Sequence, residues 1–499
     1  MILRNVIPRP ASVVSGAGEL RLGESAVLRL NAALSDGMIA EYKGLWSRFT
    51  LRMGALTVVS DDTLDANCAV LCAGGNVCPA LRDEDEYALS VTREGAFLRG
   101  ESAAGLWHAL LTLLQLIVPL RAEGGFEGAL PEAEIHDHPA IRGMRAIHLC
   151  VFPETTLILL EKAIRLAGLM KFTHVVLEFW GSLRYDVMPE LSWPDQAYGK
   201  DEIRPLIRLI HDLGMEPIPM LNHLGHASQS RCCYGKHVVL DQNPQKALLF
   251  EPDGWTWCLS NPDTLALLRA MRRELIELCG EGRYFHLGCD ESYSYATCPL
   301  CAARDSRAML ADYLNGLAEE LGQAGRRPII WGDQLLDAAA WLRPNMASSQ
   351  SDQRTHEVLP KLDRRIVIAD WQYDVTEPHA PTAEHFMKAG FDTLLCPWDG
   401  HRNNEALGAA ADSIGAFGFM ATTWDHLPDY LREIGKAAGS CWNGAAYERC
   451  RCLHTETATL LRKVMPNLPE YQNAGWMGRE VLEFDRPLRS AAPRAVNGR

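Results

Sequence analysis

The chain has 499 residues, too many for one ordinary hydrophobic core, so two or three domains are expected. Its composition, with 47% hydrophobic and 22% charged residues, is that of a folded globular protein rather than a disordered or fibrous one. The formal net charge of −14, without a basic cluster, argues against nucleic acid as a partner, and no apolar run reaches the roughly 18 residues that span a bilayer.

The N-terminal stretch "MILRNVIPRPASVV" lacks the apolar segment of about 7–15 residues that a secretory signal carries. We therefore expect a cytoplasmic protein. The 15 cysteines agree with a reducing compartment, because their number is odd and many lie inside apolar runs such as "CAVLC". Buried free thiols are favoured over a disulfide framework.

Three parts are predicted along the chain, at residues 1–135, 136–445 and 446–499. The first is expected to be a small α+β domain, with strand-like runs at 26–34 and 56–60 and an apolar helix at 103–118. A break rich in Gly, Pro and acidic residues follows it at 120–140. The last part is expected to be a helical segment followed by a loose tail, because its final residues are polar and rich in helix breakers.

Short apolar runs recur through the middle part, with room for a helix in nearly every gap. They are "MRAIHL", "HVVLEF", "EPIPML", "YFHLGC", "PIIWGD", "IVIADW", "DTLLCPW" and "GFMATTW". One gap shows the pattern, since Asp201 can cap a helix that Gly214 then ends. Eight strands alternating with helices predict a (β/α)8 TIM barrel. A doubly wound sheet is the alternative, but "CVFPETT" follows the first strand where a Gly-rich phosphate turn would be expected.

Active sites of such barrels lie at the C-terminal ends of the strands, where this chain concentrates polar and aromatic residues. The candidates, in strand order from two to eight, are Glu178, His226, Asp290, Glu291, Trp331, Trp371, Tyr373, Trp398, Asp399 and Trp424. Indole faces stack on the C–H face of a sugar, while carboxylates bind its hydroxyls. Plain core packing is the alternative for each tryptophan, but four at matching strand ends favour a sugar site.

The adjacent acids Asp290 and Glu291 close the run "FHLGCDES". Such a pair usually lies in a solvated loop or at a helix N-terminus. Here it directly follows a predicted buried strand. Two close carboxyl groups do not both ionise freely, so one can stay protonated as an acid while the other remains an anion.

These residues resemble a known family. "HLGCDE" is similar to the His-x-Gly-x-Asp-Glu signature of glycoside hydrolase family 20, the β-N-acetylhexosaminidases. "IHDHPAIRG", "PMLNHLGHAS" and residues 86–116 fall in the family's order, and "HVVLEFWGSLRYDVMPEL" is closer to the hexosaminidase D-like branch. The resemblance covers roughly residues 1–440. It implies an exo-acting enzyme that releases terminal β-linked N-acetylglucosamine or N-acetylgalactosamine from a small carbohydrate without a cofactor.

The resemblance also implies roles for individual residues. In the family's retaining mechanism the substrate acetamide is the nucleophile, so Glu291 would be the general acid and base and Asp290 would orient the acetamide. Arg142 matches an arginine that binds sugar hydroxyls, and His226 matches a histidine that supports the site. The tryptophans that enclose the acetamide are matched by Trp331, Trp371 and Trp424.

Some positions depart from the family pattern. They are Asn222 and Leu224 in place of Asp and Pro after strand three, Trp398 and Asp399 in place of a tyrosine after strand seven, and His426 in place of Glu after strand eight. Tyr373 can supply the missing hydroxyl from strand six. The alternatives are therefore a relative acting on another β-glycoside and a catalytically weakened sugar-binding protein. The intact acid pair favours an enzyme, because binding alone needs no proton donor.

The segment "CPLC" is half of a zinc pattern. Cys298 and Cys301 could be completed by Cys232 and Cys233, although adjacent cysteines are poorly spaced as ligands. Reduced cysteines without a metal are therefore preferred. Besides the carbohydrate, a homodimer is the one partner that is left open.

Overall fold

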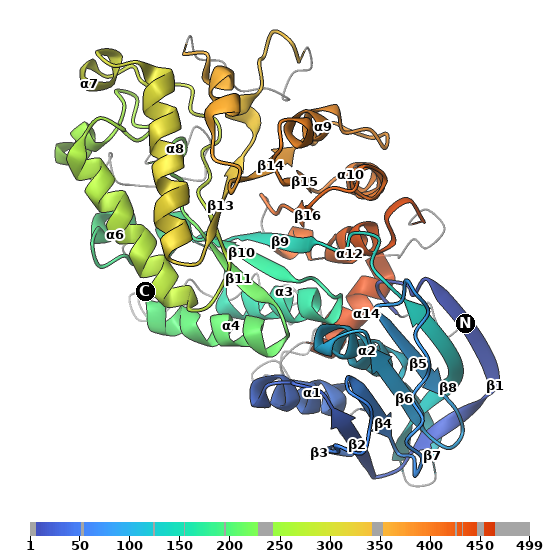
Figure 1. Cartoon of the computed structure of the whole chain (residues 1–499). Helices are drawn as coiled ribbons and strands as arrows, with labels where there is room; N and C mark the ends of the chain where they lie inside the picture. The colour runs from blue at the N-terminus through green and yellow to red at the C-terminus, as the bar shows by residue number, and fades with distance from the viewer. Residues whose placement is uncertain are drawn as a thin grey trace, which may run out of the picture.

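The computed structural model of the chain describes residues 6–50, 54–122, 125–153, 155–193, 196–227, 243–341, 353–424, 427–431, 433–446 and 454–464. It consists of an N-terminal sheet domain and a closed barrel with helices around it (Figure 1). None of the helices within these ranges combines the length and apolar character needed to cross a membrane.

The N-terminal domain is a single mixed sheet with two helices on the side of the barrel (Figure 1). Its elements are β1 (Ser12–Leu22), β2 (Ser25–Asn31), α1 (Asp36–Phe49), β3 (Ala55–Ser60), β4 (Cys68–Leu71), β5 (Tyr87–Val91), β6 (Ala96–Gly100), α2 (Ala103–Leu116), β7 (Val118–Ala122) and β8 (Gly125–Asp137). The sheet order is β1-β8-β5-β6-β4-β2-β3, with β7 paired to β8. The predicted small α+β domain is confirmed, and its sheet extends two residues beyond the expected boundary at 135.

The barrel is closed by eight parallel strands. They are β9 (Met144–Cys150), β10 (His174–Glu178), β11 (Glu216–Met220), β12 (Tyr284–His286), β13 (Arg327–Trp331), β14 (Val367–Trp371), β15 (Thr393–Cys396) and β16 (Gly418–Ala421). The ring closes where β16 pairs with β9, for example Gly418 with Met144. Each apolar run singled out in the sequence contains one of these strands to within one residue, so the prediction of a TIM barrel is confirmed.

Helices lie in most gaps between the strands and continue beyond the last one, while the described residues between β13 and β14 form only short 3-10 turns. The helices are α3 (Leu157–Leu169), α4 (Lys200–Asp212), α6 (Pro262–Cys279), α7 (Pro299–Ala302), α8 (Ser306–Gln323), α9 (Pro381–Lys388), α10 (His401–Ile414), α11 (Leu427–Tyr430), α12 (Ile434–Asn443) and α14 (His454–Val464). Short 3-10 turns are η2 (Trp180–Ser182), η3 (Pro189–Leu191), η4 (Pro244–Leu249), η5 (Asp333–Leu335), η6 (Thr355–Lys361) and η7 (Gly444–Ala446). Helix α14 supplies a helical segment within residues 446–499, and the predicted tail after it lies outside the described residues.

Helix α4 shows how the local sequence sets the helix ends. Its N-cap is Gly199, whose backbone N–H donates to Glu202 Oε2 at 2.8 Å, so the expected cap at Asp201 is wrong by two residues. Gly214 has φ +76°, a conformation that glycine adopts without strain, and it ends the helical turn as predicted.

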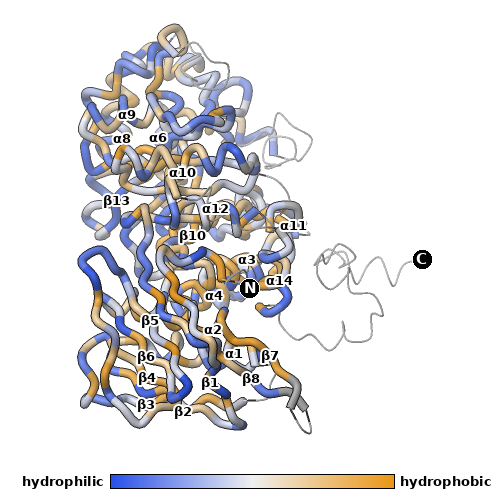
Figure 2. Tube along the Cα trace, turned by 90° about the vertical axis from the view of Figure 1, so that its right-hand side faces the viewer, coloured by the Kyte–Doolittle hydropathy of each residue, from blue (hydrophilic) through white to orange (hydrophobic). Residues whose placement is uncertain are grey.

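The strongly apolar α2 lies between the sheet and the barrel (Figures 1 and 2). Trp107 Nε1 donates to the carbonyl of Leu213 at 2.8 Å, and Gln115 Nε2 donates to that of Leu169 at 3.1 Å. Both acceptors lie at the ends of barrel helices that lead into β11 and β10. The N-terminal domain therefore covers the N-terminal ends of the barrel strands and leaves their C-terminal ends open.

Candidate active site

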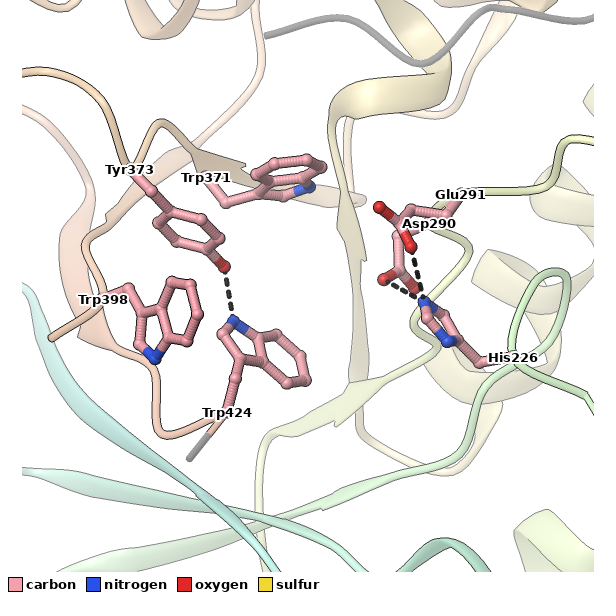
Figure 3. A pocket seen from close by; sticks show the side chains of 7 residues that line it. All are labelled: His226, Asp290, Glu291, Trp371, Tyr373, Trp398 and Trp424. Carbon is pink, nitrogen blue, oxygen red and sulfur yellow. Dashed lines mark hydrogen bonds and ion pairs between the residues drawn. The ribbon is translucent and has the colours of Figure 1, made fainter. Parts of the chain in front are cut away.

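The acid pair follows β12 in a turn with several residues in the left-handed backbone conformation. The φ angle is +65° at Gly288, +75° at Cys289 and +48° at Glu291. Residues other than glycine rarely adopt this region, and such strain concentrates at functional sites. A side chain at Gly288 would collide with the amide of Asn222, so glycine is required there. The turn brings Asp290 and Glu291 to one side of a pocket (Figure 3).

His226 joins the two carboxylates. Its Nε2 lies 3.1 Å from Asp290 Oδ2 and 3.3 Å from Glu291 Oε2 (Figure 3). The loop after β11 that carries His226 packs closely on the acid pair, because a side chain at Gly225 would collide with the carbonyl oxygen of Asp290. One imidazole can therefore hold both carboxylates in orientation.

The two acids differ in their surroundings. Asp290 is 7% exposed, and within the described part of the chain its Oδ1 is buried without a hydrogen-bond partner. The Glu291 side chain is 32% exposed. A buried oxygen without a donor is costly unless a ligand supplies one. Asp290 is thus suited to hold a ligand N–H or O–H, and Glu291 is suited to exchange a proton with solvent.

The main chain of Glu291 is fixed from two sides. Its N–H donates to Asp333 Oδ2 at 2.9 Å, and Asp333 Oδ1 accepts from Trp371 Nε1 at 3.3 Å. On the other side, Trp255 Nε1 donates to the carbonyl of Glu291 at 2.6 Å. The ring of Trp255 also lies 4.5 Å from that of His226. These bonds hold the carboxylate in place beside the pocket.

Aromatic rings form the opposite wall of the pocket (Figure 3). Trp424 Nε1 donates to the Tyr373 hydroxyl oxygen at 2.6 Å, and the Tyr373 ring lies 5.2 Å from Trp371 and 5.4 Å from Trp398. Burial among these rings raises the pKa of Tyr373 well above 10, and the charge of Asp290 adds to the effect. The phenol therefore stays protonated and can donate its O–H to a ligand.

The cavity between the acids and the rings has a volume of about 200 Å³, room for a single sugar ring. Trp331, which is 1% exposed, does not line the cavity but packs against its wall, with its ring 5.7 Å from that of Trp424. Glu178 lies beneath the pocket, where it accepts from Asn222 Nδ2 at 2.7 Å and contacts His148 Nε2 at 2.9 Å. It also accepts from an indole N–H of η2. This carboxylate supports the floor rather than facing the cavity.

Most candidates from the sequence meet at this mouth. The lining residues are His226, Asp290, Glu291, Trp371, Tyr373, Trp398 and Trp424. Glu178 and Trp331 lie directly below them. Asp399 follows β15 but is exposed and does not line the pocket, so its expected place in the site is not found.

The structure does not bring Arg142 to the pocket, where its sugar contact was expected. Arg142 precedes β9 instead of following it, and the N-terminal ends of the strands face the sheet domain. Its guanidinium donates to the carbonyl of Glu84 at 2.6 Å, on the opposite side of the barrel from the pocket. Cys150 ends β9 at the mouth.

Two supporting residues were missed from the sequence. Trp255 lies in an irregular loop between β11 and α6, where no periodicity marks it, although the local run "WTW" is a signal. Asp333 follows β13 at the same strand end as Trp331, but it was not assigned to the site. His426, Cys232 and Cys233 lie outside the described residues.

Comparison with protein families gives two matches that cover most of the chain. Residues 3–138 match the family described as glycosyl hydrolase family 20, domain 2, and residues 175–403 match the glycosyl hydrolase family 20 catalytic domain. A curated relative, the beta-hexosaminidase of Porphyromonas gingivalis, is 22% identical over 284 residues. That match covers 51% of this chain and 36% of the relative, so the chain spans only about a third of the relative's length.

Solved structures share the fold. The exo-β-N-acetylglucosaminidase of Vibrio harveyi, solved with N-acetylglucosamine, superimposes with a TM-score of 0.66 at 16% identity, covering 94% of this chain and 79% of that one. A mutant β-hexosaminidase of Streptomyces plicatus, solved with its product N-acetylglucosamine, gives 0.65 at 16% identity, covering 95% and 98%. At this identity the likeness establishes the two-domain architecture.

Proposed function

Since the chain belongs to glycoside hydrolase family 20, we propose that it is an exo-acting β-N-acetylhexosaminidase that releases terminal β-linked N-acetylglucosamine or N-acetylgalactosamine with retention of the anomeric configuration. The curated relative is named a beta-hexosaminidase, and two solved relatives hold N-acetylglucosamine. A cavity for one sugar ring agrees with cleavage at a chain end.

One observation carries the proposal. Asp290 lines the cavity with a buried oxygen that has no donor in the described part of the chain, and Glu291 lies next to it with a partly exposed carboxyl group. A plain sugar-binding site needs hydroxyl partners, but it does not need a solvent-reachable acid beside a buried anion. The pairing fits a reaction in which one group moves a proton and the other stabilises positive charge.

The proposed first step is glycoside cleavage. Glu291 gives its proton to the leaving oxygen as the bond from that oxygen to the anomeric carbon breaks. The carbonyl oxygen of the substrate acetamide forms a new bond to the anomeric carbon, giving an oxazolinium ion. Asp290 accepts the acetamide N–H and offsets its developing positive charge, while Tyr373 donates its O–H to the acetamide oxygen.

The second step returns the proton. Glu291, now a carboxylate, removes a proton from water as the water oxygen bonds to the anomeric carbon. The bond from the acetamide oxygen to the anomeric carbon breaks in the same step. The tryptophan rings enclose the acetamide methyl group and keep bulk water from the intermediate. His226 touches both carboxylates and keeps them oriented through both steps.

The test is hydrolysis of three nitrophenyl β-glycosides, those of N-acetylglucosamine, N-acetylgalactosamine and glucose, by the wild type and by Glu291→Gln. The wild type should cleave the N-acetyl substrates only. Glu291→Gln should lower kcat by roughly 10²–10⁴-fold at unchanged Tm. Glu319→Gln, an exposed carboxylate on α8, is the matched control and should leave kcat unchanged.

Two outcomes would contradict the proposal. Cleavage of the plain glucoside at a similar rate would rule out the acetamide as nucleophile and favour a relative that acts on another β-glycoside. Binding of N-acetylglucosamine without turnover of any of the three substrates would favour a sugar-binding protein.

A further inference from the structure

A second group of reactive side chains lies outside the pocket. Cys258, Cys298, Cys301 and Glu251 are all buried, and one ligand atom from each lies within 4.8 Å of all the others. Cys258 Sγ is 3.5 Å from Cys298 Sγ and 3.6 Å from Cys301 Sγ. A disulfide needs about 2.05 Å between sulfurs. Thiolates around one zinc ion, at about 2.3 Å from the metal in tetrahedral geometry, lie about 3.8 Å apart.

Glu251 gives an independent indication of a ligand. Its Oε2 accepts from the backbone N–H groups of Thr297 and Cys298, at 3.0 and 2.5 Å, and so the carboxylate is oriented toward the cysteines. Its Oε1 is buried, in a residue 1% exposed, and has no hydrogen-bond partner in the described part of the chain. Burying a carboxylate oxygen without a hydrogen-bond donor raises the free energy of the folded state unless a cation binds to it.

We propose that Cys258, Cys298, Cys301 and Glu251 hold a structural zinc ion. Three thiolates and one carboxylate complete the four tetrahedral positions of a closed site, and soft thiolate ligands favour zinc over magnesium or calcium. The backbone N–H of Cys301, which donates to Cys298 Sγ at 3.3 Å, supports a thiolate at that position. Cys258 and Glu251 therefore complete the ligand set for which the sequence had suggested Cys232 and Cys233.

The site would tie together two loops that reach the pocket. The loop from Glu251 to Cys258 carries Trp255, which bonds the carbonyl of Glu291, and the loop after β12 runs from Glu291 to Cys298. Zinc binding would therefore stabilise the fold around the acid pair without touching substrate. The inference is independent of the proposed enzymatic function.

The test is the metal content of the full chain, produced with an affinity tag that uses no metal and measured by inductively coupled plasma mass spectrometry. The wild type should hold close to one zinc per chain. Cys258→Ser, Cys298→Ser and Cys301→Ser should each lower it about tenfold. Cys279→Ala is the matched control, because Cys279 is equally buried at the end of α6 but outside the cluster, and it should keep the full zinc content.

A second measurement does not depend on the variants folding. Removing zinc from the wild type with a chelator should lower Tm by several degrees, and added zinc should restore it. Exchange for cobalt should produce the strong near-ultraviolet absorption of thiolate-to-cobalt charge transfer. Wild-type protein that carries no stoichiometric metal and shows three freely titrating thiols at these positions would overturn the proposal, as would iron in place of zinc.

Discussion

A buried aspartate lies at each end of the barrel, one in the sheet domain and one in the barrel itself, and the two differ in how many of their oxygens have hydrogen-bond partners. Asp137, at the end that faces the sheet domain, is fully buried with Lys171 Nζ 3.2 Å from its Oδ2, which also accepts from the Tyr87 hydroxyl. Its Oδ1 accepts from Trp442 Nε1 at 3.0 Å. Asp290, at the open end, contacts His226 through Oδ2, but within the described residues its Oδ1 has no hydrogen-bond partner.

The difference separates a structural carboxylate from one prepared for a ligand. A buried charge whose oxygens are all paired contributes to the join between two domains, and it offers nothing to a ligand. A buried carboxylate that lines a cavity with one oxygen unpaired keeps that oxygen for a ligand. Sequence alone does not distinguish them, because the side chains that contact each carboxylate come from distant parts of the chain.

Removing the cation at the structural end should give the largest effect. Lys171→Met leaves the Asp137 carboxylate buried without its charge partner, and we expect a loss of about 3–5 kcal/mol in the free energy of unfolding. Urea denaturation measures it. Lys388→Met is the matched control, since Lys388 is 77% exposed and pairs with Glu384 on the surface of α9. That change should cost less than about 1 kcal/mol. Equal effects would contradict the distinction between the two ends.

Changing the aspartate at the open end should affect rate rather than stability. Asp290→Asn should lower kcat for N-acetyl substrates by roughly 10²–10³-fold, because the anion that offsets acetamide charge is lost. The free energy of unfolding should change little, since Oδ1 has no partner to lose among the described residues and the amide oxygen of Asn can still accept from His226 Nε2. The loss should not depend on the leaving group, whereas that of Glu291→Gln should grow as the leaving group becomes less acidic. A large loss of stability in Asp290→Asn would show that the carboxylate is structural.

Acid should destabilise the barrel through its buried histidines. Burial lowers the pKa of His286 from 6.5 to about 3, so the native state holds it neutral. The neutral side chain contributes fully to the free energy of unfolding above pH 6.5, and this contribution is lost as pH falls toward 3. Between pH 6.5 and 5 the loss is about 2 kcal/mol.

His286→Gln should therefore flatten this part of the stability profile, measured by denaturation at a series of pH values. Part of the acid sensitivity should remain, because burial also lowers the pKa of His174 to about 4. His379→Gln, at an exposed position, should leave the profile unchanged. An unchanged profile in His286→Gln would contradict the buried neutral state.

The smallest predicted effect is on kcat/KM and comes from changing a residue of the aromatic wall. Tyr373→Phe removes the hydroxyl that we propose donates to the acetamide, and kcat/KM should fall about tenfold, the loss expected for one hydrogen bond. Tyr313→Phe, which removes a buried hydroxyl without a hydrogen-bond partner in the described residues, should leave kcat/KM unchanged. Because the pKa of Tyr373 is raised well above 10, the wild type should show no loss of activity from its ionisation below that pH.

The architecture could be predicted because each barrel strand is a short apolar run and a helix lies in nearly every gap between the strands. The alternation of runs and gaps counts the strands, and the strand-end rule then brings distant residues such as His226, Glu291 and Trp424 to one mouth. The rule depends on which end of the strand a residue occupies. Arg142 lies at the N-terminal end of its strand, away from the pocket. The family resemblance matched the order of motifs along the chain and did not show at which end of the strand the arginine lies.

The remaining features depend on how irregular loops fold. Trp255 reaches Glu291 from a loop without periodicity, and Glu251 and Cys258 meet Cys298 only after that loop packs against α7. Their separation along the sequence has no fixed relation to their distance in space. The same holds for Glu178, whose place below the pocket follows from its bonds to neighbouring strands.

The most direct test of the central claim is the hydrolysis of a series of nitrophenyl glucosaminides whose acetamide methyl carries zero to three fluorine atoms. Fluorine withdraws electrons from the carbonyl oxygen and makes it a poorer nucleophile, while the ring and the leaving group stay the same. If the substrate's own acetamide attacks the anomeric carbon, kcat should fall steeply with each fluorine. A rate that does not change across the series would contradict the account and assign the attack to a protein carboxylate or to water.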